Sequence, residues 1–245
     1  IRCYMSPKIS DIILLGTDRI HLFDTPLLMC RNQGLSMEQR AAKRVLDIIV
    51  SGLGIIVSSP IMLIIAIAVK AYDGGPVFYL QDRLTYQGKE FRIRKFRSMC
   101  VDSEKNGARL ASKHDSRITP VGHVLRNLHL DELPQLFNVF MGDMSLVGPR
   151  PERDVIMQEY EQEIPEFHYR LKVKAGLTGY AQVYGKYNTT PYDKLKLDLF
   201  YIENYSFLLD IKLLFMTVKI FFQKEVSEGV DDNQKNALKD SEDKK

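Results

Sequence analysis

Two adjacent carboxylates, Asp131 and Glu132, are the side chains of this sequence with the clearest chemical potential. They precede the stretch LPQLFNVFMG, whose apolar residues repeat at helical spacing, with Pro134 in the first turn and Gly142 at the stop. The pattern predicts a helix with the pair at its N-terminus, where the helix dipole favours an ionised Asp131. An ionised carboxylate suits a nucleophile or a Mg²⁺ ligand. The alternative is ordinary helix capping.

A single arginine, Arg150, lies between two prolines in GDMSLVGPRP. Pro149 and Pro151 restrict the backbone on both sides of it. A rigidly presented guanidinium suits bidentate recognition of phosphate. The alternative is a stiff surface turn whose arginine is merely solvated.

A basic strand is predicted upstream of the carboxylates. The segments PVFYLQDR and EFRIRKFRSM read as two short strands joined by a polar turn over residues 86–89. In the second strand Lys95 and Arg97 share one face, and Arg92 and Arg94 lie on the other. The strand is therefore either a solvated edge or a basic wall beside a polyanionic ligand or anionic headgroups.

An apolar segment covers residues 45–69, and the 22 residues 48–69 carry no charge. As a straight helix these would extend about 33 Å, enough to cross a hydrocarbon core of about 30 Å. Ser59 and Pro60 lie near the middle, where proline interrupts a helix. Basic residues flank both ends: Arg40, Lys43, Arg44 and Lys70. We favour a re-entrant helix-break-helix that enters and leaves one leaflet; a single kinked transmembrane helix is the alternative.

The remaining elements complete a helix-rich α+β pattern. Thr119 and Pro120 form a helix start, and that helix should end near Asn127. Residues 197–222 are apolar with few charges, which favours helices packed on a membrane surface or beneath the catalytic domain. The polar tail, residues 231–245, is predicted to be disordered.

The composition narrows the partners. The 34 basic and 31 acidic residues nearly balance, which argues against nucleic acid. Three distant cysteines, Cys3, Cys30 and Cys100, fit reduced thiols better than disulfides or a zinc site.

Several long motifs occur in an order that resembles the monotopic phosphoglycosyl transferases, or bacterial sugar transferases, over about residues 41–230. These motifs are KRVLDIIVSGLGIIVSSP, QDR, GKEFRIRKFRSM, LRNLHLDELPQLFNVFMGDMSLVGPRPE and KAGLTGYAQVYGK. The resemblance implies a monotopic membrane protein whose re-entrant helix, short hairpin and surface amphipathic helices surround an active site at the membrane interface.

The resemblance also implies roles for individual residues. Asp131 and Glu132 match the catalytic dyad, and Ser59 and Pro60 match the break in the membrane helix. The remaining matches are expected substrate contacts: Lys95, Arg126, Pro149, Arg150, Pro151 and Lys186. Arg97, on the same face of the basic strand as Lys95, is a further expected contact. Tyr184 and Lys186 stand where many members have Asn and Arg, so the sugar is left open.

The activity implied is transfer of a phosphosugar from a UDP-sugar to undecaprenyl phosphate, with UMP released and a covalent phosphosugar on Asp131. Mg²⁺ held by the dyad is the expected cofactor. The expected place is the cytoplasmic face of the bacterial plasma membrane, in the first membrane step of exopolysaccharide, capsule or glycoconjugate synthesis, in contact with membrane lipids. Monomer and homodimer both remain open.

The expected domains are the end of an upstream nucleotide-fold-like domain (1–36), the membrane helix (37–72), the catalytic domain (73–230) and the tail (231–245). The leading segment implies a piece of a longer protein with further amino-terminal transmembrane helices. Two rival functions stay open: a membrane-bound nucleotide-sugar pyrophosphohydrolase and a noncatalytic scaffold.

Overall fold

The structure is a computed structural model that describes residues 7–15, 17–22, 25–30, 35–101, 115–185 and 189–221. The helices described are α1 (Ile9–Leu15), α2 (Met37–Asp73), α3 (Pro120–Asn127), α4 (Gln135–Met141), α5 (Asp154–Glu163), α6 (Tyr180–Tyr184), α7 (Pro191–Glu203) and α8 (Phe207–Phe221). The strands are β1 (Thr17–Leu22), β2 (Thr25–Cys30), β3 (Phe78–Leu84), β4 (Glu90–Phe96), β5 (Ser145–Val147) and β6 (Gly176–Thr178). Three short 3-10 segments are η1 (Tyr86–Gly88), η2 (Leu130–Glu132) and η3 (Pro165–Lys172).

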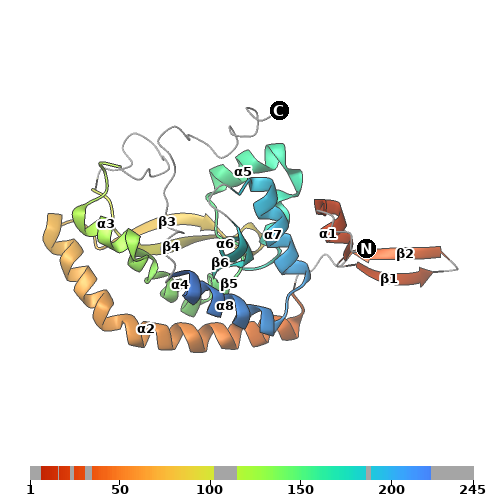
Figure 1. The fold of residues 1–245 in the computed structure, drawn as a ribbon, viewed down its shortest axis with the longest axis horizontal. Coiled ribbons are helices and arrows are strands. Elements are labelled where there is room, and N and C mark those ends of the chain that lie inside the picture. Colours follow the sequence, from red (N-terminus) through yellow and green to blue (C-terminus); the bar gives the residue numbers. More distant parts are fainter. Residues whose placement is uncertain are drawn as a thin grey trace.

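The strands form three small two-stranded sheets, so helices make up most of the fold (Figure 1). β1 with β2 and β3 with β4 are antiparallel, whereas β5 and β6 are parallel. The helix-rich α+β expectation and the short hairpin are confirmed. The predicted tail, residues 231–245, lies outside the described residues.

The β3–β4 hairpin has the side-chain alternation that the sequence predicts. Phe91 and Ile93 are buried, and Lys95 follows on the same face, directly opposite Tyr79 of β3. The other face carries Arg92, which pairs with Asp82 across the strands at 3.4 Å and is largely exposed. One row of the hairpin therefore faces the protein, while the other is exposed at Arg92 and becomes buried at Phe96, where β4 ends.

Helix α2 runs without interruption through Pro60, and Figure 1 shows that it is bent. Proline has no N–H to donate to the carbonyl four residues earlier, that of Ile56. The Ser59 hydroxyl donates to this carbonyl at 2.8 Å. Because serine replaces the missing hydrogen bond, the break predicted at Ser59 and Pro60 is a bend within one continuous helix.

Both halves of α2 pack on the same body of the protein. In the first half the Asp47 carboxylate accepts hydrogen bonds from the Ser145 hydroxyl (3.0 Å) and the Leu146 amide (2.9 Å) at β5. In the second half three apolar side chains enter a cluster with the hairpin and α3: Met62, Ile65 and Val69 pack with Phe96 and Leu125. The bend thus brings two distant parts of one helix onto one domain.

The opposite face of α2 is an exposed apolar surface. It consists of Val45, Ile48, Ile49, Leu53, Ile56, Val57, Ile61, Leu63, Ile64 and Ile67. Among the described residues, α2 is the one helix long and apolar enough to cross a membrane, and only 17% of its most apolar stretch is buried. Apolar area of this extent belongs against lipid or another apolar partner.

A buried polar network fastens the start of α2 to α8. Lys43 is 6% exposed, and its Nζ lies 2.5 Å from Asp210 Oδ2 and 3.0 Å from the Tyr201 hydroxyl. The same hydroxyl donates to Asp210 Oδ1 at 2.7 Å. Each polar group of this trio therefore has a partner, which a buried ion pair requires.

The main apolar core lies above α2 and is formed by the hairpin, β5, β6, α5, α7 and α8. Ile9 and Ile12 of α1 are buried in this core, and α1 packs against α7. The helix start at Thr119 is confirmed, since its hydroxyl accepts from the Gly122 amide at 2.9 Å. α3 ends at Asn127, as predicted.

We predict that Lys43→Ala destabilises the protein by about 3–5 kcal/mol, because it leaves Asp210 buried without its counter-charge. Thermal unfolding in detergent should show a lowered Tm. Replacing both partners by apolar residues, Lys43→Met with Asp210→Leu, should restore most of the loss.

The matched control is Lys212→Ala, which removes an exposed lysine from α8. It should leave Tm nearly unchanged, since exposed charges contribute little. Equal Tm values for Lys43→Ala and Lys212→Ala would show that the buried pair does not hold α2 in place.

Candidate active site

The carboxylate pair lies in the short 3-10 segment η2, between α3 and α4. The sequence predicted one helix beginning at the pair, but α4 begins only at Gln135. Two local features separate the segments: His129 has a left-handed backbone (φ 52°), and Pro134 has no N–H to extend a helix across the junction. Asp131 and Glu132 therefore sit in a tight turn next to a helix and not in its first turn.

Glu132 is held by two cations from different elements. Its Oε1 lies 2.6 Å from Lys95 Nζ, on β4, and 3.0 Å from Arg150 Nη2, in the loop after β5. Burial alone raises the pKa of Glu132, but the charges of Arg150 and Lys95 outweigh it and hold the pKa well below its usual range. Glu132 is a permanent anion that joins hairpin, turn and loop.

Asp131 differs sharply from its neighbour. It makes no hydrogen bond or ion pair with the residues that the structure describes. Burial raises the pKa of Asp131 above its ordinary value, the Glu132 charge adds to the rise, and Lys95 opposes it. Asp131 thus lies in a turn whose burial disfavours its charge, and not in the first turn of a helix, where the dipole would favour it. A desolvated, unpaired carboxylate next to two cations suits a nucleophile.

The two cations differ in their access to solvent. Lys95 is 20% exposed, and burial lowers the pKa of Lys95 although Glu132 partly offsets this. Arg150 is 44% exposed, and the charge of Glu132 raises the pKa of its guanidinium further. Arg150 thus stays charged and faces outward, as a ligand-binding arginine must.

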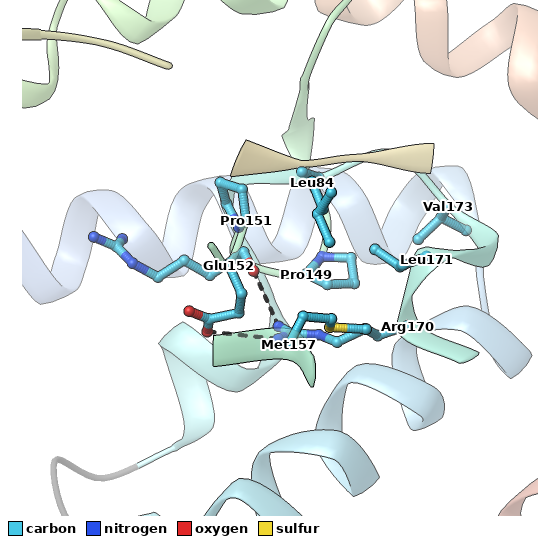
Figure 2. Close-up of a pocket in the computed structure, with 10 residues that line it drawn as sticks. Leu84, Pro149, Pro151, Glu152, Met157, Arg170, Leu171 and Val173 are labelled. Carbon is cyan, nitrogen blue, oxygen red and sulfur yellow. Dashed lines mark hydrogen bonds and ion pairs between the residues drawn. The ribbon is translucent and has the colours of Figure 1, made fainter. Parts of the chain in front are cut away.

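The loop that carries Arg150 is held by hydrogen bonds as well as by its prolines. Three successive carbonyls each accept one donor: Pro149 from the Gly176 amide (2.9 Å), Arg150 from Arg170 Nη2 (3.0 Å) and Pro151 from Arg83 Nη1 (3.1 Å). Figure 2 shows the Arg170 side chain below Pro149 and Pro151, with a dashed line to the loop backbone. The predicted stiffness of the loop thus has a second physical basis.

Sequence reasoning missed the charged residues that support this loop. Glu152 follows the loop and contacts Lys194, Arg170 and Arg83. Burial raises the pKa of Glu152, but Lys194 and Arg170 outweigh it and lower the pKa to about 2. The motifs QDR and PRPE contained Arg83 and Glu152, which was the available signal; Arg170 is isolated in the sequence and gave none.

Of the other residues predicted to contact substrate, Arg126 lies near the carboxylate pair and Arg97 does not. The positive charge of Arg126 acts on Asp131, and its Nη1 is buried without a partner among the described residues. Arg97 lies elsewhere: its guanidinium pairs with Asp73, at the end of α2, and is 7% exposed. Lys186 lies outside the described residues. The structure thus gathers Lys95, Arg126 and Arg150 around the pair and leaves Arg97 with α2.

A Mg²⁺ ion would find two adjacent carboxylates here. Within the described part of the chain no group of three or more His, Cys, Asp or Glu side chains converges on one point. Mg²⁺ commonly binds through one or two carboxylates together with substrate phosphates and water. Asp131 and Glu132 therefore fit an ion shared with a phosphorylated ligand, and not one caged by protein alone.

Comparison with known proteins identifies a family to which the chain is similar. The family model described as bacterial sugar transferase matches residues 38–224. The chain is 44% identical over 180 residues to a UDP-N-acetylgalactosamine-undecaprenyl-phosphate N-acetylgalactosaminephosphotransferase of Aeromonas hydrophila, over 72% of this chain and 43% of the relative. It is 43% identical over 208 residues to a UDP-glucose:undecaprenyl-phosphate glucose-1-phosphate transferase of Klebsiella pneumoniae, over 83% of this chain and 43% of the relative.

A third relative is the undecaprenyl-phosphate galactose phosphotransferase of Salmonella typhimurium, 36% identical over 237 residues, covering 89% of this chain and 49% of the relative. The chain thus spans about half the length of these relatives or less. The matched residues 38–224 include α2, the hairpin, the carboxylate pair and the Arg150 loop. The chain belongs to the bacterial sugar transferase family.

Proposed function

We propose that this chain transfers a phosphosugar from a UDP-sugar to undecaprenyl phosphate and releases UMP. One observation carries the proposal: the carboxylate of Asp131, which has no partner among the described residues, lies beside Glu132, and Glu132 draws Lys95 and Arg150 together. An unpaired nucleophile next to two fixed cations is the arrangement that phosphoryl transfer needs. The names of the relatives support the class of donor and acceptor.

The reaction proceeds in two displacements. An Asp131 oxygen attacks the phosphorus that bears the sugar; the new O–P bond forms as the bond to UMP breaks, and the electron pair leaves on UMP. A phosphate oxygen of undecaprenyl phosphate then attacks the same phosphorus and displaces Asp131. The products are undecaprenyl diphosphate-sugar and the free carboxylate, so Asp131 is regenerated.

Fixed charge stabilises both displacements. Arg150 offers an exposed, permanently charged guanidinium to the diphosphate, and Lys95 brings an ammonium to the same side of Glu132. Mg²⁺ bound by Asp131 and Glu132 would neutralise charge on the diphosphate and its leaving group. Glu132 holds Lys95 and Arg150 at the site.

We predict that the purified chain, with Mg²⁺, releases UMP from a UDP-sugar in repeated turnovers only when undecaprenyl phosphate is present. The relatives are named for three sugars, so the assay uses UDP-N-acetylgalactosamine, UDP-glucose and UDP-galactose in parallel. Arg150→Ala should lower kcat/KM by about tenfold to a hundredfold, and Arg150→Lys should recover little of it, because an ammonium cannot form the bidentate contact.

The matched control is Arg92→Ala, which removes an exposed arginine from the solvent face of β4. It should keep full activity. Free sugar phosphate in place of the lipid-linked product would favour the pyrophosphohydrolase, and absence of turnover with every donor would favour the scaffold.

We further propose that α2 enters and leaves the membrane on the cytoplasmic side. Both halves of α2 pack on one domain, at Asp47 and at Ile65, while the opposite face of the helix is apolar and exposed. A straight span would carry the second half away from that domain across the bilayer. This arrangement would keep the carboxylate pair near the headgroups, where the phosphate of the lipid acceptor lies.

Cysteines at Ala42 and Tyr72, both exposed and at opposite ends of α2, test this topology. Tyr72 is preferred to Asp73, which pairs with Arg97. With Cys3, Cys30 and Cys100 replaced by serine, a membrane-impermeant maleimide should label both positions in inside-out vesicles and neither in spheroplasts.

The reference is Glu163→Cys, on the exposed end of α5 within the catalytic body. Positions 42 and 72 should both follow it. Labelling of the two ends of α2 from opposite sides would establish a transmembrane span and reject the re-entrant proposal.

A further inference from the structure

We infer that Arg170 is a positioning residue that sets the placement of Arg150 through the backbone of the loop. This inference rests on the proposed function, because it assigns Arg150 to a UDP-sugar diphosphate. It concerns a side chain that does not itself reach the ligand: Arg170 is 2% exposed, whereas Arg150 is 44% exposed.

The Arg170 guanidinium contacts the backbone of Arg150 and two carboxylates. Its Nη2 donates to the Arg150 carbonyl at 3.0 Å and lies 2.7 Å from Asp198 Oδ2. Its Nη1 lies 3.5 Å from Glu152 Oε1, two residues further along the loop. Figure 2 shows two of these contacts, which run from Arg170 to Glu152 and to the loop backbone. One planar group therefore fixes both the Arg150 carbonyl and the residue that ends the loop.

Two carboxylates offset the cost of burying the Arg170 guanidinium. Asp198 is 1% exposed on α7, and Glu152 is also held by Lys194. The Arg170 guanidinium lies 4.9 Å from the centre of the Phe167 ring, which adds a favourable cation–π contact. The carboxylates of Asp198 and Glu152 compensate the positive charge of Arg170, so the guanidinium can be buried and held in one position.

Stability alone does not explain an arginine here. The Nε of Arg170 is buried and has no partner among the described residues, and an unsatisfied buried donor costs free energy. The flanking carbonyls of Pro149 and Pro151 have their own donors, Gly176 and Arg83. Arg170 is thus the side chain that holds the carbonyl of residue 150 itself, and this contact orients the peptide from which the guanidinium extends.

A lysine cannot replace this contact set. Its single nitrogen lacks the forked geometry that reaches the Arg150 carbonyl and the Glu152 carboxylate together. We therefore expect Arg170→Lys to keep the charge while releasing the loop. Small misplacement of a binding group lowers function by about tenfold to a hundredfold.

The test is a double-mutant cycle of Arg170→Lys and Arg150→Ala, read as the Kd for UDP by calorimetry and as kcat/KM for the UDP-sugar. Arg170→Lys alone should weaken UDP binding by about tenfold. In the Arg150→Ala background it should have little further effect, because a positioning residue acts only through the group that it positions. Asp198→Asn, a milder change, should give a smaller loss with the same coupling.

A purely structural role predicts a different result. Ile202→Val perturbs the buried face of α7 without touching the loop, and it should lower Tm while leaving the Kd for UDP unchanged. Multiplicative losses in the cycle, or an unchanged Kd in both Arg170→Lys and Asp198→Asn, would overturn the inference. Coupled UDP binding without sugar transfer would reject the proposed reaction and keep the inference; no UDP binding by the unaltered chain would reject both.

Discussion

The carboxylate of Glu132, shared by Lys95 and Arg150, is the interaction on which the rest of the site depends. It brings together three segments that are distant in the sequence: the hairpin, the turn before α4 and the loop after β5. Two cations this close together repel each other, so the anion between them is what allows both to face one ligand. Its neighbour Asp131 has no partner among the described residues, and burial raises the pKa of that carboxyl, to which the Glu132 charge adds. One member of the pair organises the site, and the other is free to react.

The membrane helix and the site are parts of one architecture. The bend at Ser59 and Pro60 keeps the helix hydrogen-bonded through the serine hydroxyl, so α2 can follow the domain without exposing a bare carbonyl to an apolar surface. The second half of α2 packs against Phe96, which ends β4 and follows Lys95 in the sequence. The next residue, Arg97, pairs with Asp73 at the end of α2. The strand that supplies a cation to the site is therefore also the strand on which the membrane helix rests.

Local sequence patterns predicted the hairpin, the helix after Thr119, the apolar α2 and the residue pair with its proline-flanked arginine. These follow from alternation, capping and composition, which are properties of short segments. The raised pKa of Asp131 could not be predicted in this way, because it depends on burial and on the opposing charge of Lys95, which is 36 positions away in the sequence. Arg170 gave no local signal for the same reason: its partners Arg150, Glu152 and Asp198 meet it only through the packing of α7 against the loop. Arg97 belongs to the motif GKEFRIRKFRSM, but its guanidinium pairs with Asp73 at the end of α2.

The most direct measurement is to trap the phosphosugar on Asp131. The purified chain is incubated with Mg²⁺ and a UDP-sugar labelled in the sugar, without lipid acceptor, and the label is located by peptide mapping. We predict one labelled peptide containing Asp131 and UMP released in equal amount. Asp131→Asn should not be labelled, and Glu132→Gln should be labelled more slowly, because the neutral amide no longer gathers Lys95 and Arg150. Label on another residue, or turnover that requires donor and acceptor together with no trapped adduct, would contradict the division of labour between the two carboxylates.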